Sequence, residues 1–416
     1  MFEAGNANAA LYFVDRHCAE GRGDKVAYID ADGETTFDGL RQATDRMVGF
    51  YEGLGVPRES RVAMLVLDAI AFPVIFWGSL KAGIVPVALN TLLSTDQYRF
   101  ILGDCRARVL FVSAPLYETV APLLDGHPTI EHVFVIGGEA GGHPRFEDRL
   151  ASAPPGPAVA VTGDETAFWL YSSGSTGMPK GVIHVHSSLK GTSDTYALNV
   201  LGIREDDVVF SVAKLFFAYG LGNAMTFSLA VGATTVLFPG RPTPDAIFEV
   251  LETHRPTVFY AVPTLFAAML GAAGGGPVPG MDRVRLSVSA GEALPEEIGA
   301  RWKARHGTDI LDGVGSTEML HIFLSNVPGD VVYGTSGVPV PGYDVRLVDE
   351  RDADVAVGEV GEMLVKGGTA ASAYWNQREK SRRTFLGEWT RTGDKYIRRD
   401  DGRYIYCGRT DDMFKV

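Results

Sequence analysis

Cysteine is rare in this 416-residue chain, and negative charge outweighs positive charge. The three cysteines, Cys18, Cys105 and Cys407, lie far apart and form no CxxC pair, so we expect neither a disulfide framework nor a zinc site. The formal net charge of −13 leaves no basic surplus to neutralise phosphates, which argues against nucleic acid and anionic membranes as partners. Any bound polyphosphate must therefore be held by a local arrangement of donors.

Long apolar runs are also missing. The longest nearly apolar stretch, residues 69–80, has 12 residues and is interrupted by Pro73 and Gly78, so it is too short to span a bilayer. The N-terminal sequence MFEAGNANAALYFVDRHC carries charges early and does not have the pattern of a signal or transit peptide. We therefore expect a cytoplasmic protein, and a hydrophobic content of 46% is ordinary for a globular one.

Strand-like and helix-like patterns alternate from about residue 36 to about residue 320. Thr36 is a candidate N-cap for a helix whose apolar residues recur at spacings of three and four. Continuous apolar runs separated by helical segments indicate parallel sheets that are covered on both faces. We predict such strands at residues 62–67, 84–89, 109–112, 133–136, 257–262 and 286–289.

The pattern changes after about residue 325. Short strand-like segments at 344–348, 362–365 and 404–406 are separated by Gly, Pro and Asp turns. We therefore predict an α/β fold of stacked, mostly parallel sheets with helices, forming two subdomains over about 1–325, followed by a small β-rich subdomain over about 326–408.

Residues 167–181, AFWLYSSGSTGMPKG, carry the most chemical information. An apolar strand leads into a loop with three glycines, four hydroxyl side chains and Lys180. Glycines let backbone N–H groups turn toward one centre, and a concave row of such donors suits the oxygens of a polyphosphate. A solvated Ser/Gly linker is the alternative, but a linker seldom follows a buried strand directly. A P-loop needs Gly-Lys-Ser/Thr before a helix, whereas Lys180 lies between Pro179 and Gly181.

This stretch resembles the phosphate-binding signature of the adenylate-forming superfamily, which includes acyl-CoA synthetases, luciferases and the adenylation domains of peptide synthetases. Further stretches follow in the order of that family: SAGEALP at 289–295, DGVGSTE at 312–318, WTRTGD at 389–394 and GRTDD at 408–412. The resemblance implies the large domain of such an enzyme. It also implies a phosphate-binding loop made of Ser172, Ser173, Gly174, Ser175, Thr176, Gly177 and Lys180.

The same resemblance implies how the nucleoside is bound. Asp312 would accept from the adenine amino group, Asp394 would bind both ribose hydroxyls, and Arg409 would reach the ribose or a phosphate. Thr317 would contact the α-phosphate, and Glu318 would help to hold Mg²⁺, which prefers oxygen ligands. The remaining adenine contacts would come from Gly291, Glu292, Ala293, Gly313 and Val314, with Val314 in a position where most of the superfamily has tyrosine.

Residues 409–416 resemble the hinge of the family, with Asp411 as its pivot. In the family a small C-terminal domain with a catalytic lysine follows the hinge. Because the sequence ends at Val416, we expect it to be the large domain alone, able to bind an aryl-adenylate but slow to make the thioester.

Two stretches indicate the acid. Residues 214–223, KLFFAYGLGN, and 319–326, MLHIFLSN, resemble the benzoate–CoA ligase branch, and a flat ring suits aromatic and aliphatic walls. Without the resemblance, these aromatic residues would suit a plain core equally well, and His321 would more often be a structural histidine. The resemblance implies an aryl pocket of Ala218, Tyr219, Gly315, His321 and Ile322.

The implied activity is adenylation of an aromatic carboxylate by ATP and Mg²⁺, with coenzyme A as the second acceptor and with Thr317, Glu318 and Lys180 as catalytic residues. Ala261 and Val262 stand where smaller residues often occur in that branch, so an aminobenzoate or hydroxybenzoate stays open beside benzoate. A domain that loads a carrier-protein pantetheine and a non-catalytic nucleotide- and acid-binding domain are the competing hypotheses. Whether the protein is a homodimer stays open as well.

Overall fold

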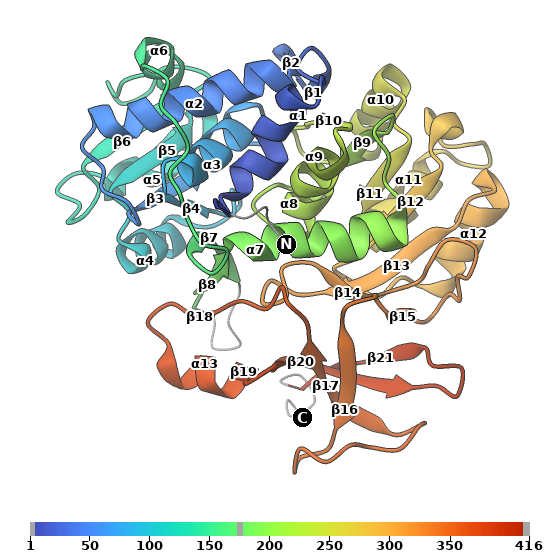
Figure 1. The fold of residues 1–416 in the computed structure, drawn as a ribbon. Coiled ribbons are helices and arrows are strands. Elements are labelled where there is room, and N and C mark those ends of the chain that lie inside the picture. Colours follow the sequence, from blue (N-terminus) through green and yellow to red (C-terminus); the bar gives the residue numbers. More distant parts are fainter. Residues whose placement is uncertain (1–4, 173–177, 411–416) are drawn as a thin grey trace.

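Three β-sheets with surrounding helices make up the fold in the computed structural model, which describes residues 5–172 and 178–410. Two large sheets of nine and seven strands form the upper part of Figure 1, and a five-stranded sheet lies below them. The predicted fold class is confirmed: the molecule is an α/β protein with mostly parallel large sheets and a small β-rich part. Within the described residues, no helix combines the length and the apolar character that a membrane crossing needs.

The seven-stranded sheet has the order β18-β8-β7-β4-β3-β5-β6. Strands β7, β4, β3, β5 and β6 are parallel neighbours, whereas β8 is antiparallel to β7 and β18 is antiparallel to β8. Its strands are β3 (Arg61–Leu65), β4 (Val85–Ala88), β5 (Val109–Ser113), β6 (His132–Ile136), β7 (Thr166–Ser172), β8 (Lys180–Val185) and β18 (Ala373–Tyr374).

The nine-stranded sheet has the order β15-β14-β13-β12-β11-β9-β10-β1-β2. Its middle strands, from β1 to β13, are parallel, so their carboxyl ends lie at one edge, and Asp312 is in register with Ser289 there. Its strands are β1 (Val26–Asp30), β2 (Gly33–Thr36), β9 (Val208–Ser211), β10 (Thr234–Val236), β11 (Val258–Ala261), β12 (Leu286–Ser289), β13 (Ile310–Gly315), β14 (Ile322–Ser325) and β15 (Val338–Pro339).

The five-stranded sheet is antiparallel throughout. Two short strands that follow residue 325, β15 and β18, pair instead with the large sheets, so the chain returns to both of them late. The subdomain limit near residue 325 stays a prediction. The strands of the small sheet are β16 (Asp344–Val348), β17 (Val360–Lys366), β19 (Phe385–Leu386), β20 (Trp389–Arg398) and β21 (Tyr404–Arg409).

Helix α2 begins where the sequence predicts it. The Thr36 side chain accepts a hydrogen bond from the Gly39 backbone N–H, which satisfies one of the free donors of the first turn. Close packing of α2 on α3 requires a glycine, because a Cβ at Gly78 would lie 2.3 Å from the Met47 Cβ. The α-helices are α1 (Arg16–Ala19), α2 (Phe37–Gly53), α3 (Ala71–Lys81), α4 (Thr95–Cys105), α5 (Tyr117–Val120), α6 (Phe146–Ser152), α7 (His186–Thr192), α8 (Ala218–Leu221), α9 (Phe227–Val231), α10 (Pro244–His254), α11 (Pro263–Ala272), α12 (Glu296–His306) and α13 (Arg378–Thr384), and α7 continues into a π-helix over Ser193–Leu201.

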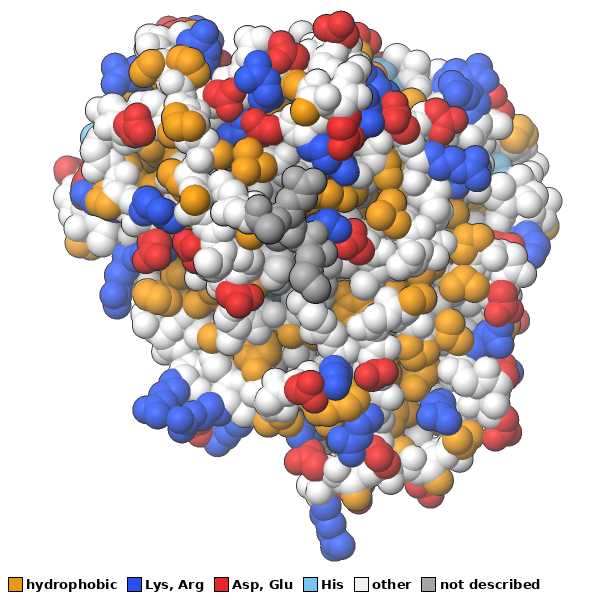
Figure 2. Space-filling view, in the orientation of Figure 1, with side chains coloured by type: hydrophobic (Ala, Val, Ile, Leu, Met, Phe, Trp, Pro, Cys, Tyr) orange, Lys and Arg blue, Asp and Glu red, His pale blue; other side chains and the backbone are white. Residues whose placement is uncertain are grey.

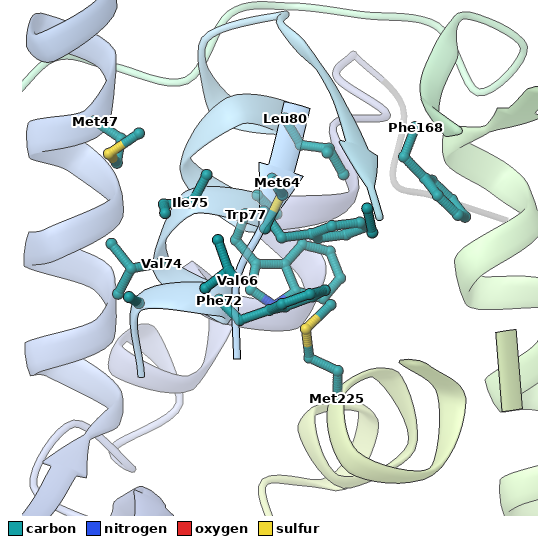
Figure 3. Close-up of a cluster of buried hydrophobic side chains, with 14 of the residues drawn as sticks. Met47, Met64, Val66, Phe72, Val74, Ile75, Trp77, Leu80, Phe168 and Met225 are labelled. Atoms are coloured by element: carbon teal, nitrogen blue, oxygen red, sulfur yellow. The ribbon is translucent and has the colours of Figure 1, made fainter. Parts of the chain in front are cut away.

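Strand β3 illustrates why continuous apolar runs become central strands. Val62 and Met64 enter one hydrophobic core, while Ala63 and Leu65 enter another on the opposite face of the sheet. The first core reaches across to the segment that contains α8, as Figure 3 shows for Met225 beside the α3 side chains. The two large sheets are therefore joined by shared packing, which holds α8 in a defined place.

Charged side chains of both signs are interspersed over the face shown in Figure 2. Charged residues make up an ordinary 21% of the whole chain, and acidic residues outnumber basic ones. A charged site must accordingly be built by side chains that converge locally.

Candidate active site

Three residues from distant parts of the chain form a charged cluster between the large sheets and the small one. The Lys180 Nζ lies 3.0 Å from the Glu318 Oε1, and both side chains are mostly buried. The Tyr374 hydroxyl donates to the same Glu318 oxygen over 2.8 Å and accepts from the Lys180 Nζ over 2.9 Å. Strand pairing explains the proximity, because Tyr374 lies opposite Val182 on the strand that Lys180 begins.

This cluster controls the charge of Glu318. Burial alone would raise the pKa of Glu318, but the Lys180 charge and the hydrogen bonds from Lys180 and Tyr374 outweigh it and lower the pKa. Burial and the neighbouring carboxylate raise the pKa of Tyr374, so the phenol keeps its proton and stays a donor. Glu318 is therefore an anion whose charge is balanced by one ammonium.

The backbone around Glu318 is also held in place. The His184 ring lies 2.8 Å from the Thr317 carbonyl oxygen, and the Ala371 N–H donates to the Glu318 carbonyl oxygen over 2.7 Å. Burial lowers the pKa of His184 to about 4, so the ring is neutral and its Nε2–H is the donor to Thr317. The Ser172 hydroxyl reaches the Glu318 carboxylate at 3.5 Å, the limit of a hydrogen bond.

Asp394 and Arg409 form a second charged pair at the same site. The Arg409 Nη1 donates to the Asp394 Oδ1 over 2.9 Å across the paired strands β20 and β21. Burial raises the pKa of Asp394, the Arg409 charge opposes this, and the charge of Glu318 adds to the rise. The two carboxylates are thus close enough to influence each other, which brings the small sheet into the site.

Asp312 offers an unused acceptor at the carboxyl end of β13. Its Oδ1 is buried and has no hydrogen-bond partner among residues 5–172 and 178–410. Burial raises the pKa of Asp312 to about 8, and the Leu294 N–H only partly opposes the effect. The predicted adenine contacts lie nearby: Gly291, Glu292 and Ala293 are exposed in the connection from β12 to α12, and Gly313 and Val314 follow Asp312.

Most residues of the predicted aryl pocket also come together. Tyr219 lies on α8, and its ring centroid is 5.6 Å from that of His321, whose Nε2 is 3.2 Å from the Tyr219 carbonyl oxygen. Gly315 must be glycine, because a Cβ there would lie 2.5 Å from the His321 carbonyl oxygen. Ile322 begins β14 and is buried, and Ala218 is 9% exposed at the start of α8.

His321 is a neutral, structurally held side chain. Burial lowers its pKa to about 3, and its Nε2 also lies 3.2 Å from the Asn223 Oδ1. The Tyr219 hydroxyl donates to the Val288 carbonyl oxygen over 3.2 Å. The Tyr219 hydroxyl and the His321 Nε2 are thus bonded to the protein, whereas the His321 Nδ1 has no partner among the described residues; the other side chains here are aromatic or aliphatic.

Six predicted site residues lie outside the described residues: Ser173, Gly174, Ser175, Thr176, Gly177 and Asp411. Two neighbours of the site were not found by motif reasoning, namely Tyr374 and His184. His184 had a usable signal, because Lys180 and His184 are four residues apart on one strand and therefore share a face. Tyr374 had no such signal in the sequence, since β18 is only two residues long and shows no periodicity.

Residues 15–375 match the model of the AMP-binding enzyme family. The chain belongs to this family of adenylate-forming enzymes, and its sequence places it in the benzoate–CoA ligase branch. It is 52% identical to the 4-hydroxybenzoate–CoA/benzoate–CoA ligase of Rhodopseudomonas palustris, over 98% of this chain and 76% of that protein. The benzoate–CoA ligase of Thauera aromatica is also 52% identical, over 98% of this chain and 78% of its own length.

Solved structures of two CoA ligases are similar to this chain in both sequence and fold. A benzoate CoA ligase from Burkholderia xenovorans is 48% identical and superposes with a TM-score of 0.92, covering 99% of this chain and 81% of that one. The anthranilate CoA ligase AuaEII, in complex with anthranoyl-AMP, is 40% identical with a TM-score of 0.95, covering 100% and 80%.

Proposed function

We propose that the protein is an ATP-dependent aryl-acid:CoA ligase that adenylates a benzoate-type carboxylate and then forms the aryl-CoA thioester. One observation carries this proposal beyond the sequence similarity. A single hairpin, β13–β14 with its connection, carries Asp312 for the adenine, Glu318 for the metal, and Gly315 and His321 for the ring. Nucleotide and aryl acid would therefore meet along one short segment, as an attack of the acid on the α-phosphate requires.

In this proposal the nucleoside is bound by two carboxylates. One has an oxygen without a partner in the described chain, and the other is paired with an arginine. The unpartnered Asp312 Oδ1 accepts from the adenine amino group, and Asp394 accepts from the ribose hydroxyls beside Arg409. Lys180 pairs with a phosphate of ATP, and the hydroxyl of Ser172, which lies opposite Lys180 in the β7–β8 pair, is a further donor. Thr317 contacts the α-phosphate.

Glu318 could bind Mg²⁺ only if the nucleotide supplied further ligands. Within the described part of the chain, no group of three or more His, Cys, Asp or Glu side chains is arranged to hold a metal ion. Mg²⁺ is usually bound by one or two carboxylates and the substrate phosphates, and one ionised carboxylate is what this site provides. The ion would neutralise phosphate charge as it develops.

The reaction then has two steps. A carboxylate oxygen of the arylate attacks the α-phosphorus, the bond to the β-phosphate oxygen breaks, and pyrophosphate leaves. The CoA thiolate next attacks the acyl carbon of the aryl-adenylate and displaces AMP. Neutral His321 and the bonded Tyr219 hydroxyl have no proton-transfer role and serve as walls for the ring.

Benzoate is the acid that the pocket favours. Its polar side-chain groups, the Tyr219 hydroxyl and the His321 Nε2, already have protein partners, so an unsubstituted ring loses no hydrogen bond on entry. A hydroxybenzoate or an aminobenzoate is the second candidate. The His321 Nδ1 is buried without a partner in the described chain, and in the neutral ring it is an acceptor for a donating substituent.

Two measurements test the function. Benzoate-dependent exchange of pyrophosphate into ATP would distinguish an enzyme from a domain that only binds nucleotide and acid. Mass spectrometry of the products with free CoA or a holo-carrier protein as acceptor would then distinguish a CoA ligase from a carrier-loading enzyme. We expect exchange with benzoate and only slow benzoyl transfer to CoA by residues 1–416; exclusive transfer to the carrier would reject the ligase proposal. We also propose a cytoplasmic location, where ATP and CoA are available, while the homodimer stays a prediction.

A further inference from the structure

Tyr374 connects the two charges of the site. Its hydroxyl accepts from the Lys180 Nζ and donates to the Glu318 Oε1, while the ammonium also lies 4.3 Å from the centroid of its ring. None of the sequence motifs of the proposed function includes this residue. It is nevertheless the only side chain of the described residues that is hydrogen-bonded to both Lys180 and Glu318.

Contacts other than those with Lys180 and Glu318 hold the phenol of Tyr374 in its place. Tyr374 is 3% exposed, and its ring packs against Phe385 with centroids 5.2 Å apart. Its backbone pairs with Val182 of β8, and its N–H donates to the Ser381 hydroxyl over 3.0 Å. Tyrosine at this place is therefore a fixed donor, whereas the long Lys180 side chain has several rotatable bonds.

Charge balance explains why a fixed donor is useful. Without nucleotide, the Lys180 ammonium neutralises Glu318 across 3.0 Å. A phosphate group that binds Lys180 removes this compensation and leaves a largely buried carboxylate beside another anion, which is strongly unfavourable. A divalent cation on Glu318 restores the balance, but only if the carboxylate stays in its place when the ammonium turns away.

We propose that Tyr374 is a positioning residue that keeps Glu318 oriented for the metal while Lys180 exchanges Glu318 for a phosphate of the nucleotide. This inference rests on the proposed function, since it assumes that Mg·ATP is the ligand. The proposal has a thermodynamic consequence, namely that the metal ion and the nucleotide each strengthen the binding of the other. The metal ion neutralises Glu318 when a phosphate takes Lys180, and the phosphate neutralises Lys180 when the metal ion takes Glu318. Tyr374 contributes to that coupling through its hydroxyl.

The test compares Tyr374→Phe with the parent protein by calorimetric titration of α,β-methylene-ATP, which cannot be cleaved at the reacting bond, with and without Mg²⁺. A second ligand is a benzoyl-adenylate analogue in which a sulfamate replaces the phosphate, because it has no polyphosphate and needs no metal. Tyr51→Phe is the matched control: it also removes a buried hydroxyl with a hydrogen bond, to the Ser79 Oγ over 2.7 Å in a different part of the fold.

We expect Mg²⁺ to strengthen binding of the ATP analogue in the parent and in Tyr51→Phe, and Tyr374→Phe to reduce this strengthening about tenfold, since a hydrogen bond to a charged group is lost. Binding of the benzoyl-adenylate analogue should stay within about twofold in all three proteins. In a Glu318→Gln background, which removes the metal's carboxylate, Tyr374→Phe should have no further effect on the Mg²⁺ dependence.

An unchanged Mg²⁺ effect in Tyr374→Phe would reject the positioning role. Equal weakening of both ligands would also reject it, because a purely structural defect acts on both. If Tyr374→Phe fails to fold, the Glu318→Gln and Lys180→Gln single variants and their double variant test the same exchange, and additive effects on the Mg²⁺ dependence would reject it. A parent protein that binds neither ligand would instead reject the proposed function itself.

Discussion

Arg409 and Asp394 lie directly opposite each other on strands β21 and β20, with the Arg409 Nη1 2.9 Å from the Asp394 Oδ1. The pair stands on the small antiparallel sheet, yet the charge of Glu318 from the β13–β14 connection raises the pKa of Asp394. The small five-stranded sheet therefore contributes to the same candidate site as the two large sheets. We therefore expect a ligand at this place to contact residues of all three sheets, and the following predictions test their contributions.

Replacing Asp394 by Asn should weaken AMP binding. An amide has one acceptor oxygen instead of two and leaves Arg409 without its counter-charge, and a lost charge-assisted hydrogen bond amounts to about 1.5–3 kcal/mol, or roughly 10- to 150-fold in affinity. Calorimetric titration with AMP would measure the change. Asp401→Asn is the control, since Asp401 pairs with Arg403 in the same part of the fold; equal losses in both variants would contradict the ribose assignment.

Replacing Glu318 by Gln should leave the fold intact and slow adenylation by about 10²–10³-fold, because the carboxylate that we propose as the metal ligand loses its charge. Benzoate-dependent pyrophosphate exchange over a range of Mg²⁺ concentrations is the measurement. Glu131→Gln serves as control, as Glu131 pairs with Arg108 at the surface. A near-normal rate at low Mg²⁺ would show that Glu318 does not bind the metal.

Enlarging Ala218 to Leu should obstruct the aryl pocket. Ala218 is 9% exposed in the shared core, and overpacking such a site typically costs about 1–3 kcal/mol, or about 5- to 150-fold in affinity for benzoate. The control is Ala272→Leu, which adds the same atoms at the exposed end of α11. Benzoate binding as tight as in the parent would remove Ala218 from the pocket.

Asp68 should make stability depend on pH. Its carboxylate is buried and accepts from the Leu215 N–H over 3.2 Å, and burial raises its pKa to about 7, with Lys214 opposing. The folded state therefore binds this proton more tightly than the unfolded state, so its contribution favours folding at low pH and is lost as the pH rises from about 4 toward 7.

The comparison is the free energy of unfolding of the parent and of Asp68→Asn at pH 5 and pH 8. We expect the variant to gain stability relative to the parent at the higher pH, because the amide cannot ionise. A difference between the two proteins that is the same at both pH values would contradict the assignment.

Sequence reasoning predicted the parallel strands and the charged motifs, for definite physical reasons. Strands such as β4 and β5 carry apolar residues on both faces, and the Thr36 cap marks the start of α2. Tyr374 was not predicted, because its place is set by pairing between segments almost 200 residues apart, which no local pattern encodes. The unpartnered oxygen of Asp312 is likewise a property of the assembled site.

The central claim is that this site binds an aryl-adenylate, and calorimetric titration with the sulfamate analogue of benzoyl-adenylate tests it most directly. Burial of a ring as large as that of Phe contributes about 1.5–3 kcal/mol, so the benzoyl analogue should bind roughly 10- to 150-fold more tightly than AMP. It should also bind more tightly than the corresponding dodecanoyl analogue, because that chain is much longer than the ring for which we propose Tyr219 and His321 as walls. Equal affinity for the benzoyl and dodecanoyl analogues, or no binding of the benzoyl analogue, would contradict the account.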